Sequence, residues 1–163
     1  MLKGVEKAGG STERVFLPAL NVAHCRQCDD NGWGLCRTEG RCVVDDDLRG
    51  LVEKIRLSDN VIFATPVYYA DLSESMRAFT DRVRRISTHE AGRVSIKGKH
   101  AIGVCVAGGG GGGAPACCVS LEKVMSICGF DVVDMIPVRR QNLQAKLKEL
   151  ELVGQWLVSN GTI

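Results

Sequence analysis

The sequence predicts an α/β protein with a mostly parallel, doubly wound sheet, because short segments rich in Val and Ile alternate with amphipathic ones. Its 163 residues are the size of one ordinary domain, and 45% of them are hydrophobic, which is enough for a substantial core. There is neither an internal repeat nor a linker. We therefore expect residues 1–163 to form a single domain with a Cys-rich loop at residues 24–42.

Four segments are predicted to be strands, and their apolar runs suit a parallel sheet that is covered on both faces. The first is a short one, Glu13–Leu17. The second is Asn60–Tyr69, which begins as a buried strand and breaks at its proline. The last two are His100–Ala107 and Phe130–Val138.

The first two predicted helices have charged N-termini. Residues Asp45–Asp47 open one, where negative charge suits the helix dipole, and apolar residues then recur at helical spacing. A second helix is predicted from about Leu72 to Ile86, with Asp71 as its cap and Glu74 completing a capping box. The apolar positions are Leu48, Leu51, Val52 and Ile55 in the first helix, and Leu72, Met76, Phe79, Val83 and Ile86 in the second.

Two further helices follow the third and fourth predicted strands. One runs from about Pro115, a residue suited to a first turn, to Cys128, and Gly129 is its expected C-terminal cap. The last helix is predicted from its leucines. Its buried face should consist of Leu143, Leu147, Leu150 and Leu157.

Composition excludes several kinds of partner. The net charge of +2 gives no reason to expect nucleic acid. No apolar run reaches the roughly 18 residues that span a bilayer, so no membrane partner is expected. The N-terminal residues carry no hydrophobic segment typical of a signal peptide, which predicts a cytoplasmic location. There, the 8 cysteines should be thiols, metal ligands or cluster ligands rather than disulfides.

Two loops are candidates for ligand binding, since doubly wound sheets bind ligands at the carboxyl ends of their strands. In ATPVYYADLSESM, Tyr68 and Tyr69 follow a stiff proline turn. Aromatic rings beside backbone amides would suit a flat heteroaromatic ligand, and ordinary loop packing is the alternative. In VCVAGGGGGGAPACC, the glycines Gly108–Gly113 let the backbone approach a planar ligand, and a flexible surface loop is the alternative.

The Cys-rich loop contains a C-x-x-C pair, Cys25 and Cys28, followed by Cys36 and Cys42. Thiolates at this spacing can bind one metal. His24 is expected to be a loop residue rather than a ligand. Three of the remaining cysteines lie in apolar segments and are expected to be small core residues: Cys105, Cys118 and Cys128. No role is assigned to Cys117.

Three segments together resemble the NADPH-dependent FMN reductase and iron–sulfur flavoprotein branch of the flavodoxin-like superfamily. They are CRQCDDNGWGLCRTEGRCVVDDDL, ATPVYYADLSESMRAFTDRVRR and VAGGGGGG. The resemblance runs from about Met1 to the last helix. It implies a flavodoxin-like sheet with FMN as the cofactor, the tyrosine loop packed against the flavin ring, and the glycine loop along the ring's other edge. The implied FMN contacts are Thr65, Pro66, Val67, Tyr68, Tyr69, Asp71, Ala107, Gly108, Gly109, Gly110 and Gly111.

The resemblance also implies a first strand and a small-residue phosphate loop ahead of the first helix. The sequence begins at what resembles the end of that helix, LKGVEKAGG. We therefore expect an N-terminally short flavodoxin-like domain without this strand and loop, with unpaired strand edges beside the ligand crevice. A fragment, a wrong start, a strand from another chain and a differently closed sheet remain open as explanations.

For the four cysteines, the resemblance implies a 4Fe–4S cluster at Cys25, Cys28, Cys36 and Cys42, although the family's first three cysteines are closer together. A zinc ion and free thiols are the alternatives. The implied function is that of an FMN-dependent NAD(P)H oxidoreductase, whose flavin relays hydride or electrons to a small-molecule or protein acceptor. An iron–sulfur electron-transfer subunit and a degenerate, non-catalytic scaffold are the other hypotheses. A homodimer or homotetramer is expected by resemblance.

Overall fold

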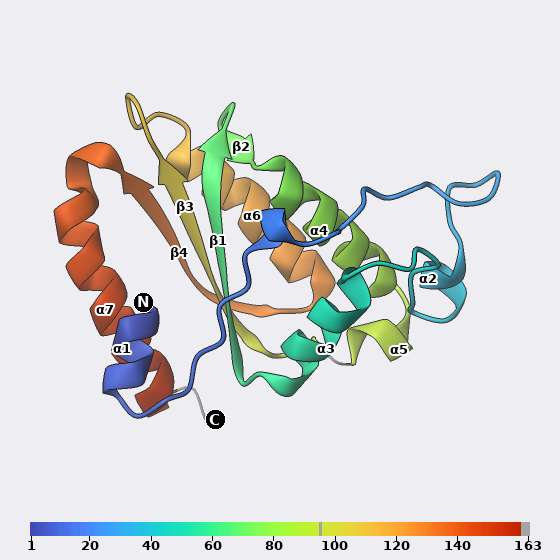
Figure 1. The fold of residues 1–163 in the computed structure, drawn as a ribbon, viewed down its shortest axis with the longest axis horizontal. Coiled ribbons are helices and arrows are strands. Elements are labelled where there is room, and N and C mark those ends of the chain that lie inside the picture. Colours follow the sequence, from blue (N-terminus) through green and yellow to red (C-terminus); the bar gives the residue numbers. More distant parts are fainter. Residues whose placement is uncertain (95, 161–163) are drawn as a thin grey trace.

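The fold is an open α/β sheet with helices on both faces (Figure 1). The computed structural model describes residues 1–94 and 96–160. In this part of the chain the strand order is β2-β1-β3-β4; β1, β3 and β4 are parallel, and β2 is antiparallel to β1. The strands are β1 (Asn60–Tyr68), β2 (Asp71–Leu72), β3 (His100–Ala107) and β4 (Asp131–Arg139). The prediction of a mostly parallel α/β sheet is confirmed.

The helices form two layers that cover opposite faces of the sheet (Figure 1). The α-helices are α1 (Leu2–Lys7), α2 (Leu35–Thr38), α3 (Leu48–Leu57), α4 (Glu74–Ile86), α5 (Glu90–Arg93), α6 (Ala114–Cys128) and α7 (Leu143–Asn160), and the 3-10 helices are η1 (Leu17–Ala19) and η2 (Arg140–Asn142). The larger core cluster lies on the α4 and α6 side and includes Phe63, Phe79 and Leu121. A smaller cluster, with Ile102, Ile136 and Leu157, lies on the α7 side.

The predicted strand Glu13–Leu17 is wrong. This segment is extended only in part and ends in η1, which begins at Leu17 with Pro18 in its first turn. Leu17, Leu20 and Val22 pack against the larger core cluster. The apolar residues therefore indicated burial, but a strand also needs a neighbour to pair with, and the segment has none among the described residues.

The predicted break of the second strand at Pro66 is also wrong. Pro66 is in register with Val106, and β1 continues to Tyr68. Within the described residues, the other edge of β1 pairs with β2 at Val67 and Tyr68 alone. Most of β1 is thus an edge strand, where the missing N–H of a proline is tolerated.

The second predicted helix begins two residues later than expected. Its N-cap is Ser73, whose Oγ accepts a hydrogen bond from Met76 N–H at 3.4 Å, and not Asp71. Asp71 and Leu72 instead form β2, which folds back on β1. Both Asp71 and Ser73 are good capping residues, and strand pairing decided between them.

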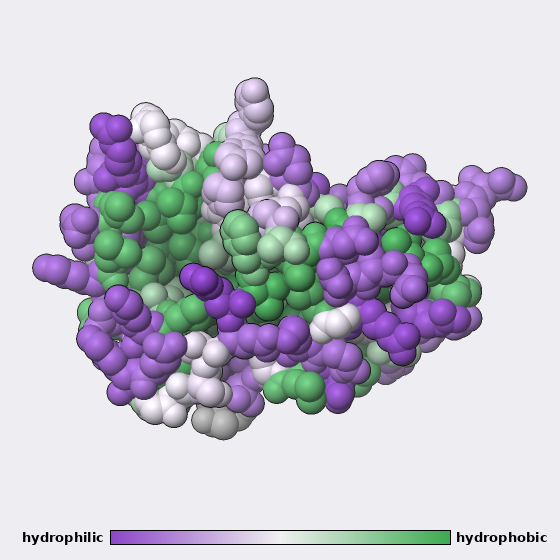
Figure 2. Space-filling model, in the orientation of Figure 1, coloured by the Kyte–Doolittle hydropathy of each residue, from purple (hydrophilic) through white to green (hydrophobic). Residues whose placement is uncertain are grey.

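The other helix predictions agree with the structure except at one face of α7. Helix α6 begins one residue before Pro115 and ends at Gly129, whose φ of 104° is the expected left-handed cap. Leu157 is buried and Leu150 partly so, but Leu143 and Leu147 remain 37% and 50% exposed. Figure 2 shows hydrophobic surface between α7 and β1.

Candidate functional site

Three loops meet at the carboxyl ends of β1, β3 and β4, and we call this region the strand-end site. It consists of the hairpin turn Tyr69–Ala70, the glycine loop Gly108–Gly113 and the start of η2. The Gln141 side-chain amide donates a hydrogen bond to the carbonyl oxygen of Gly110 at 3.0 Å. A Cβ on Gly113 would lie 2.7 Å from the Cα of Ala70. Contact between the loops therefore depends on glycine at this position.

The hairpin between β1 and β2 is strained. Tyr69 and Ala70 have φ angles of 50° and 62°, the left-handed conformation that a two-residue hairpin turn requires. For a non-glycine residue this conformation costs roughly 1–2 kcal/mol. The Tyr69 ring is fully exposed and Tyr68 is half exposed, so packing does not hold Tyr69 in place. Strain at an exposed aromatic residue favours a role in binding.

The glycine loop presents bare backbone. A Cβ built on Gly108, Gly109 or Gly110 would meet no atom within 4 Å, and all three residues are exposed. The loop is nevertheless an ordered turn, because Gly111 N–H donates to the carbonyl oxygen of Gly108 at 2.8 Å. This surface, beside two exposed tyrosines, fits one side of a flat ring system.

Several predicted contact residues make contacts within the protein. Thr65 is buried; its Oγ1 accepts a hydrogen bond from Ser73 N–H at 3.2 Å and donates to the Pro66 carbonyl at 2.9 Å. Thr65 therefore joins β1 to the start of α4. Ala107 and Gly111 are also buried. The predicted residues with exposed surface are Pro66, Tyr68, Tyr69, Gly108, Gly109 and Gly110, while Val67 and Asp71 are partly buried.

Asp71 is held by an ion pair with Arg77 at 2.5 Å, measured from Oδ2 to Nη2. Burial tends to raise the pKa of the Asp71 carboxyl group. Hydrogen bonds from Leu72 N–H and Ser120, together with Arg77, outweigh this effect and hold the pKa below its ordinary value. Asp71 is thus an ionised residue that supports the hairpin.

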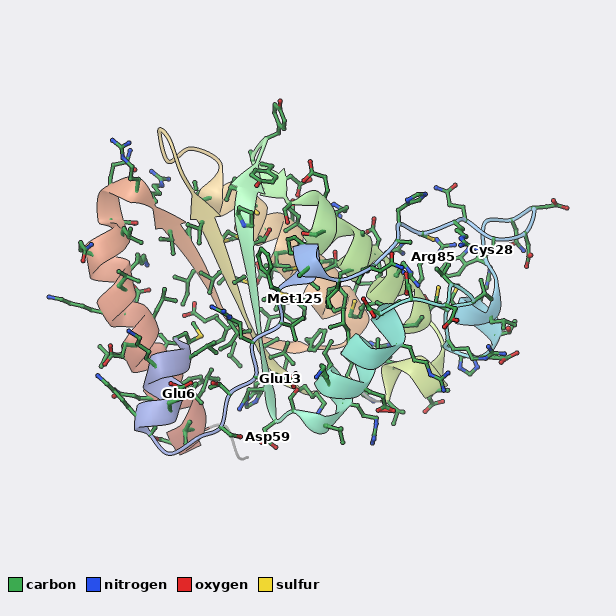
Figure 3. The ribbon with its side chains drawn as sticks, in the orientation of Figure 1. Glu6, Glu13, Cys28, Asp59, Arg85 and Met125 are labelled. Atoms are coloured by element: carbon green, nitrogen blue, oxygen red, sulfur yellow. The ribbon has the colours of Figure 1, made fainter. Side chains whose placement is uncertain are left out.

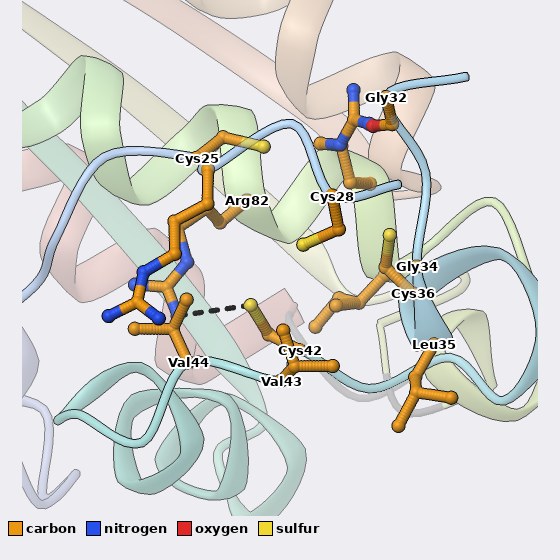
Figure 4. Close-up of a pocket in the computed structure, with 13 residues that line it drawn as sticks. Cys25, Cys28, Gly32, Gly34, Leu35, Cys36, Cys42, Val43, Val44 and Arg82 are labelled. Atoms are coloured by element: carbon orange, nitrogen blue, oxygen red, sulfur yellow. Dashed lines mark hydrogen bonds between the residues drawn. The ribbon is translucent and has the colours of Figure 1, made fainter. Parts of the chain in front are cut away.

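The four predicted metal ligands line a single pocket at the other end of the molecule, which we call the cysteine pocket (Figure 4). Figure 3 shows two of its lining residues, Cys28 and Arg85, at the end of the molecule farthest from α7. No group of three or more His, Cys, Asp or Glu residues in the described ranges is arranged to hold a metal ion. The thiols therefore share a pocket without preformed coordination. His24 is exposed and does not line the pocket.

The Cys-rich loop is folded tightly against α4. Gln27 and Asp29 have positive φ angles of 50° and 55°. The guanidinium of Arg85 lies 4.2 Å from the centre of the Trp33 ring and donates a hydrogen bond to the carbonyl of Gly32. Arg37 lies 5.4 Å from the same ring. The two contacts of Arg85 hold the Cys-rich loop against α4.

A buried ion pair that the sequence did not reveal lies beneath the pocket. Arg82 is 1% exposed and forms a bidentate pair with Asp46, at 2.5 Å and 3.0 Å. Its Nη1 also donates to the carbonyl of Ala23 at 3.0 Å, and its Nη2 donates to the Sγ of Cys42 at 3.2 Å. Burial tends to raise the pKa of Asp46, but Arg82 and the N–H groups of Ala23 and Leu48 hold it below its ordinary value.

One sequence signal could have identified Arg82. It follows Phe79 by three residues and precedes Val83, so it occupies the apolar face of α4. A charged residue on a buried face needs a partner, because an unpaired charge is strongly unfavourable there.

The other four cysteines are core residues; the prediction is confirmed for Cys105, Cys118 and Cys128, and Cys117 is also buried. Burial raises the pKa of the Cys128 thiol to about 12 and also raises that of Cys105. None of the helices in the described ranges has the length and apolar character needed to cross a membrane.

An open parallel sheet with an aromatic hairpin and a glycine loop at the carboxyl ends of its strands defines a flavodoxin-like protein. The family model described as NADPH-dependent FMN reductase matches residues 1–145. The chain belongs to this family.

Curated relatives of this chain bear the name iron-sulfur flavoprotein. One from Methanosarcina thermophila is 31% identical over 81% of this chain, and one from Archaeoglobus fulgidus is 33% identical over 64%. The chain spans 65% and 44% of their respective lengths. A solved structure of RosB with a bound riboflavin-5'-phosphate derivative matches this chain with a TM-score of 0.66 and 16% sequence identity. The match covers 98% of this chain and 67% of the RosB chain, and it supports the fold.

Proposed function

We propose that the protein binds FMN at the strand-end site and acts as an NAD(P)H-dependent oxidoreductase. The observation that carries the proposal is the exposed backbone of Gly108–Gly110 beside Tyr68 and Tyr69, at the carboxyl ends of parallel strands. The family, which is named for FMN reduction, supports it. Bound flavin supplies the capacity to accept hydride from NADPH or NADH and to pass electrons to an acceptor.

In this proposal, the protein's own residues bind and orient the ring. Backbone N–H groups of Gly108–Gly110 are free to donate hydrogen bonds to ring heteroatoms, since the absence of side chains permits close approach. Tyr68 and Tyr69 supply aromatic surface. Gly113 holds the hairpin against the glycine loop, so both sides of the site keep a fixed separation. By resemblance, the phosphate belongs to a loop that precedes the first helix.

The first test is titration of the purified protein with FMN, with quenching of flavin fluorescence as the measure of binding. The second test measures the oxidation of NADPH and NADH by the FMN-loaded protein. Gly110→Ala should weaken FMN binding at least several-fold while the protein stays folded, because its Cβ would fill the open backbone surface. Gly50→Ala, on the exposed side of α3, is the matched control and should bind FMN like the wild type. A protein that takes up no FMN would contradict the proposal and favour the non-catalytic scaffold.

A second candidate function is electron transfer through an iron–sulfur cluster in the cysteine pocket. The observation that favours it is that Cys25, Cys28, Cys36 and Cys42 line the same pocket. Four thiols are the donor set that such clusters use, and would hold the cluster there. Iron, sulfide and zinc analysis after anaerobic purification tests it. Iron and sulfide that are lost in Cys28→Ser, but kept in Cys118→Ala, would support the cluster; zinc without sulfide, or no metal, would contradict it.

We also propose a homodimer or homotetramer and a small-molecule or protein electron acceptor, as the resemblance implies. Sedimentation velocity on the FMN-loaded protein tests the first proposal, and a monomer at micromolar concentration would contradict it. Assays with quinone, flavin and ferricyanide acceptors test the second.

A further inference from the structure

Arg82 is the buried cation that reaches a thiol of the cysteine pocket. The dashed line in Figure 4 marks its hydrogen bond to Cys42, from Nη2 to Sγ. We propose that Arg82 is a positioning residue for the metal group of this pocket: it fixes the Sγ of Cys42 and raises the reduction potential of the group. This inference rests on the proposed iron–sulfur function.

The geometry leaves the guanidinium of Arg82 no freedom to turn. Nη1 and Nη2 are both paired with the carboxylate of Asp46, and Nη1 also donates to Ala23. Asp46 is fixed in turn, because its oxygens accept hydrogen bonds from Ala23 N–H at 2.9 Å and Leu48 N–H at 3.2 Å. The N–H that points at Cys42 is therefore aimed before any metal group binds.

The expected direction of the effect follows from charge. A metal group held by four thiolates is anionic, and reduction adds a further electron, so a donor to one of the sulfurs stabilises the reduced form more than the oxidised form. Asp46 neutralises the guanidinium at longer range. The effect on the potential therefore depends on the hydrogen bond to Cys42 rather than on the net charge of residue 82.

Arg85 provides a matched control. It is also on α4 and also lines the cysteine pocket, but it donates to the carbonyl of Gly32 and contacts Trp33 rather than a thiol. Arg82→Lys keeps the charge and an ion pair with Asp46, but one ammonium group cannot reproduce the fork that holds Asp46 and Cys42 together. Arg85→Lys keeps the charge without touching this hydrogen bond.

The experiment measures iron and sulfide per chain and then the midpoint potential, by anaerobic redox titration of the wild type, Arg82→Lys and Arg85→Lys. We expect a lower potential for Arg82→Lys than for the wild type, and a smaller change for Arg85→Lys, which keeps the donor to Cys42. Equal potentials in all three proteins, or equal shifts in both variants, would overturn the role of Arg82 while leaving the iron–sulfur function intact. A wild type without iron would overturn the iron–sulfur function itself, and this inference with it.

Arg82→Lys could fail to fold, since the pair with Asp46 is buried. The double variant Arg82→Leu with Asp46→Asn removes both charges together, which leaves no unpaired charge in the core. Circular dichroism checks its fold. We expect the same fall in potential, because the donor to Cys42 is absent, and a wild-type potential in the folded double variant would overturn the proposal.

Discussion

Two arginines of helix α4 each form an ion pair with an aspartate from another segment, and the two pairs differ in burial. Near the strand-end site, Arg77 pairs with Asp71 at 2.5 Å, and their side chains are 38% and 46% exposed. Under the cysteine pocket, Arg82 pairs with Asp46 at the same distance, with side chains 1% and 2% exposed. The same two residue types thus form a solvent-screened contact in one region and a buried connection in the other.

The two regions also differ in whether backbone or side chains form them. The strand-end site consists of backbone, small residues and two exposed rings, and its geometry depends on left-handed residues such as Tyr69 and Gly113. The cysteine pocket depends on long side chains, since Arg82 and Arg85 reach from α4 to the Cys-rich loop. A backbone surface suits a flat ligand, whereas a loop fastened by side chains suits the positioning of several thiols.

The largest expected effect tests the difference between the two ion pairs. Arg82→Ala should lower the free energy of unfolding by about 3–5 kcal/mol, because Asp46 would remain buried and unpaired. Arg77→Ala should lower it by less than about 1 kcal/mol, because water replaces the lost partner. Urea denaturation measures both. Equal losses would show that burial does not distinguish the pairs.

The next effect concerns the contact between the hairpin and the glycine loop. Gly113→Ala should lower the free energy of unfolding by at least about 1–2 kcal/mol, because the new side chain would adopt a φ of 79° and collide with Ala70. Gly112→Ala is the control: its φ is not positive and its surroundings are open, so stability should be unchanged or up to about 1 kcal/mol higher. Thermal and urea unfolding compare the two, and matching losses would contradict the structural contact.

A pH effect is expected from Asp46, whose pKa is lower in the folded protein than in the unfolded chain. A lowered carboxyl pKa contributes stability that is fully present above the unfolded value of about 4 and is lost as the pH falls towards the folded value. The wild type should therefore lose stability below about pH 4. The double variant Arg82→Leu with Asp46→Asn should lose less over the same interval in urea titrations; parallel pH profiles would contradict the assignment.

The smallest effect separates stability from binding at the hairpin. Tyr69→Asn should raise the free energy of unfolding by about 0.5–1 kcal/mol, since Asn adopts the left-handed conformation more readily and the exposed Tyr69 ring makes no packing contact to lose. It should also weaken FMN binding. Tyr69→Phe keeps the ring and should change neither quantity. Unchanged FMN affinity in Tyr69→Asn would remove Tyr69 from the proposed site.

Local signals predicted the elements whose ends depend on their own residues. Pro115 and Gly129 bounded α6 to within one residue, because a first-turn proline and a left-handed cap act through the backbone alone. The alternation of β3 with α6 and of β1 with α4 predicted the parallel sheet for a similar reason. The four cysteines of the pocket were also found in this way, since one loop carries them all.

Other features depended on residues far away in the chain. Apolar character in Glu13–Leu17 and in Leu143 and Leu147 does not say whether a neighbour will pair with or cover these residues. The roles of Thr65 and Arg82 likewise depend on Ser73 and Asp46, which the fold brings to them.

The fold class, the glycine loop, the tyrosine loop and the set of four cysteines could be predicted from the sequence alone, since periodicity, caps and spacing are local properties. Two contacts could not be predicted in this way: the glycine loop touches the hairpin through Gly113, and a buried arginine donates to Cys42. Both contacts join residues on different elements. Their free energy depends on distance and burial, which no local pattern encodes.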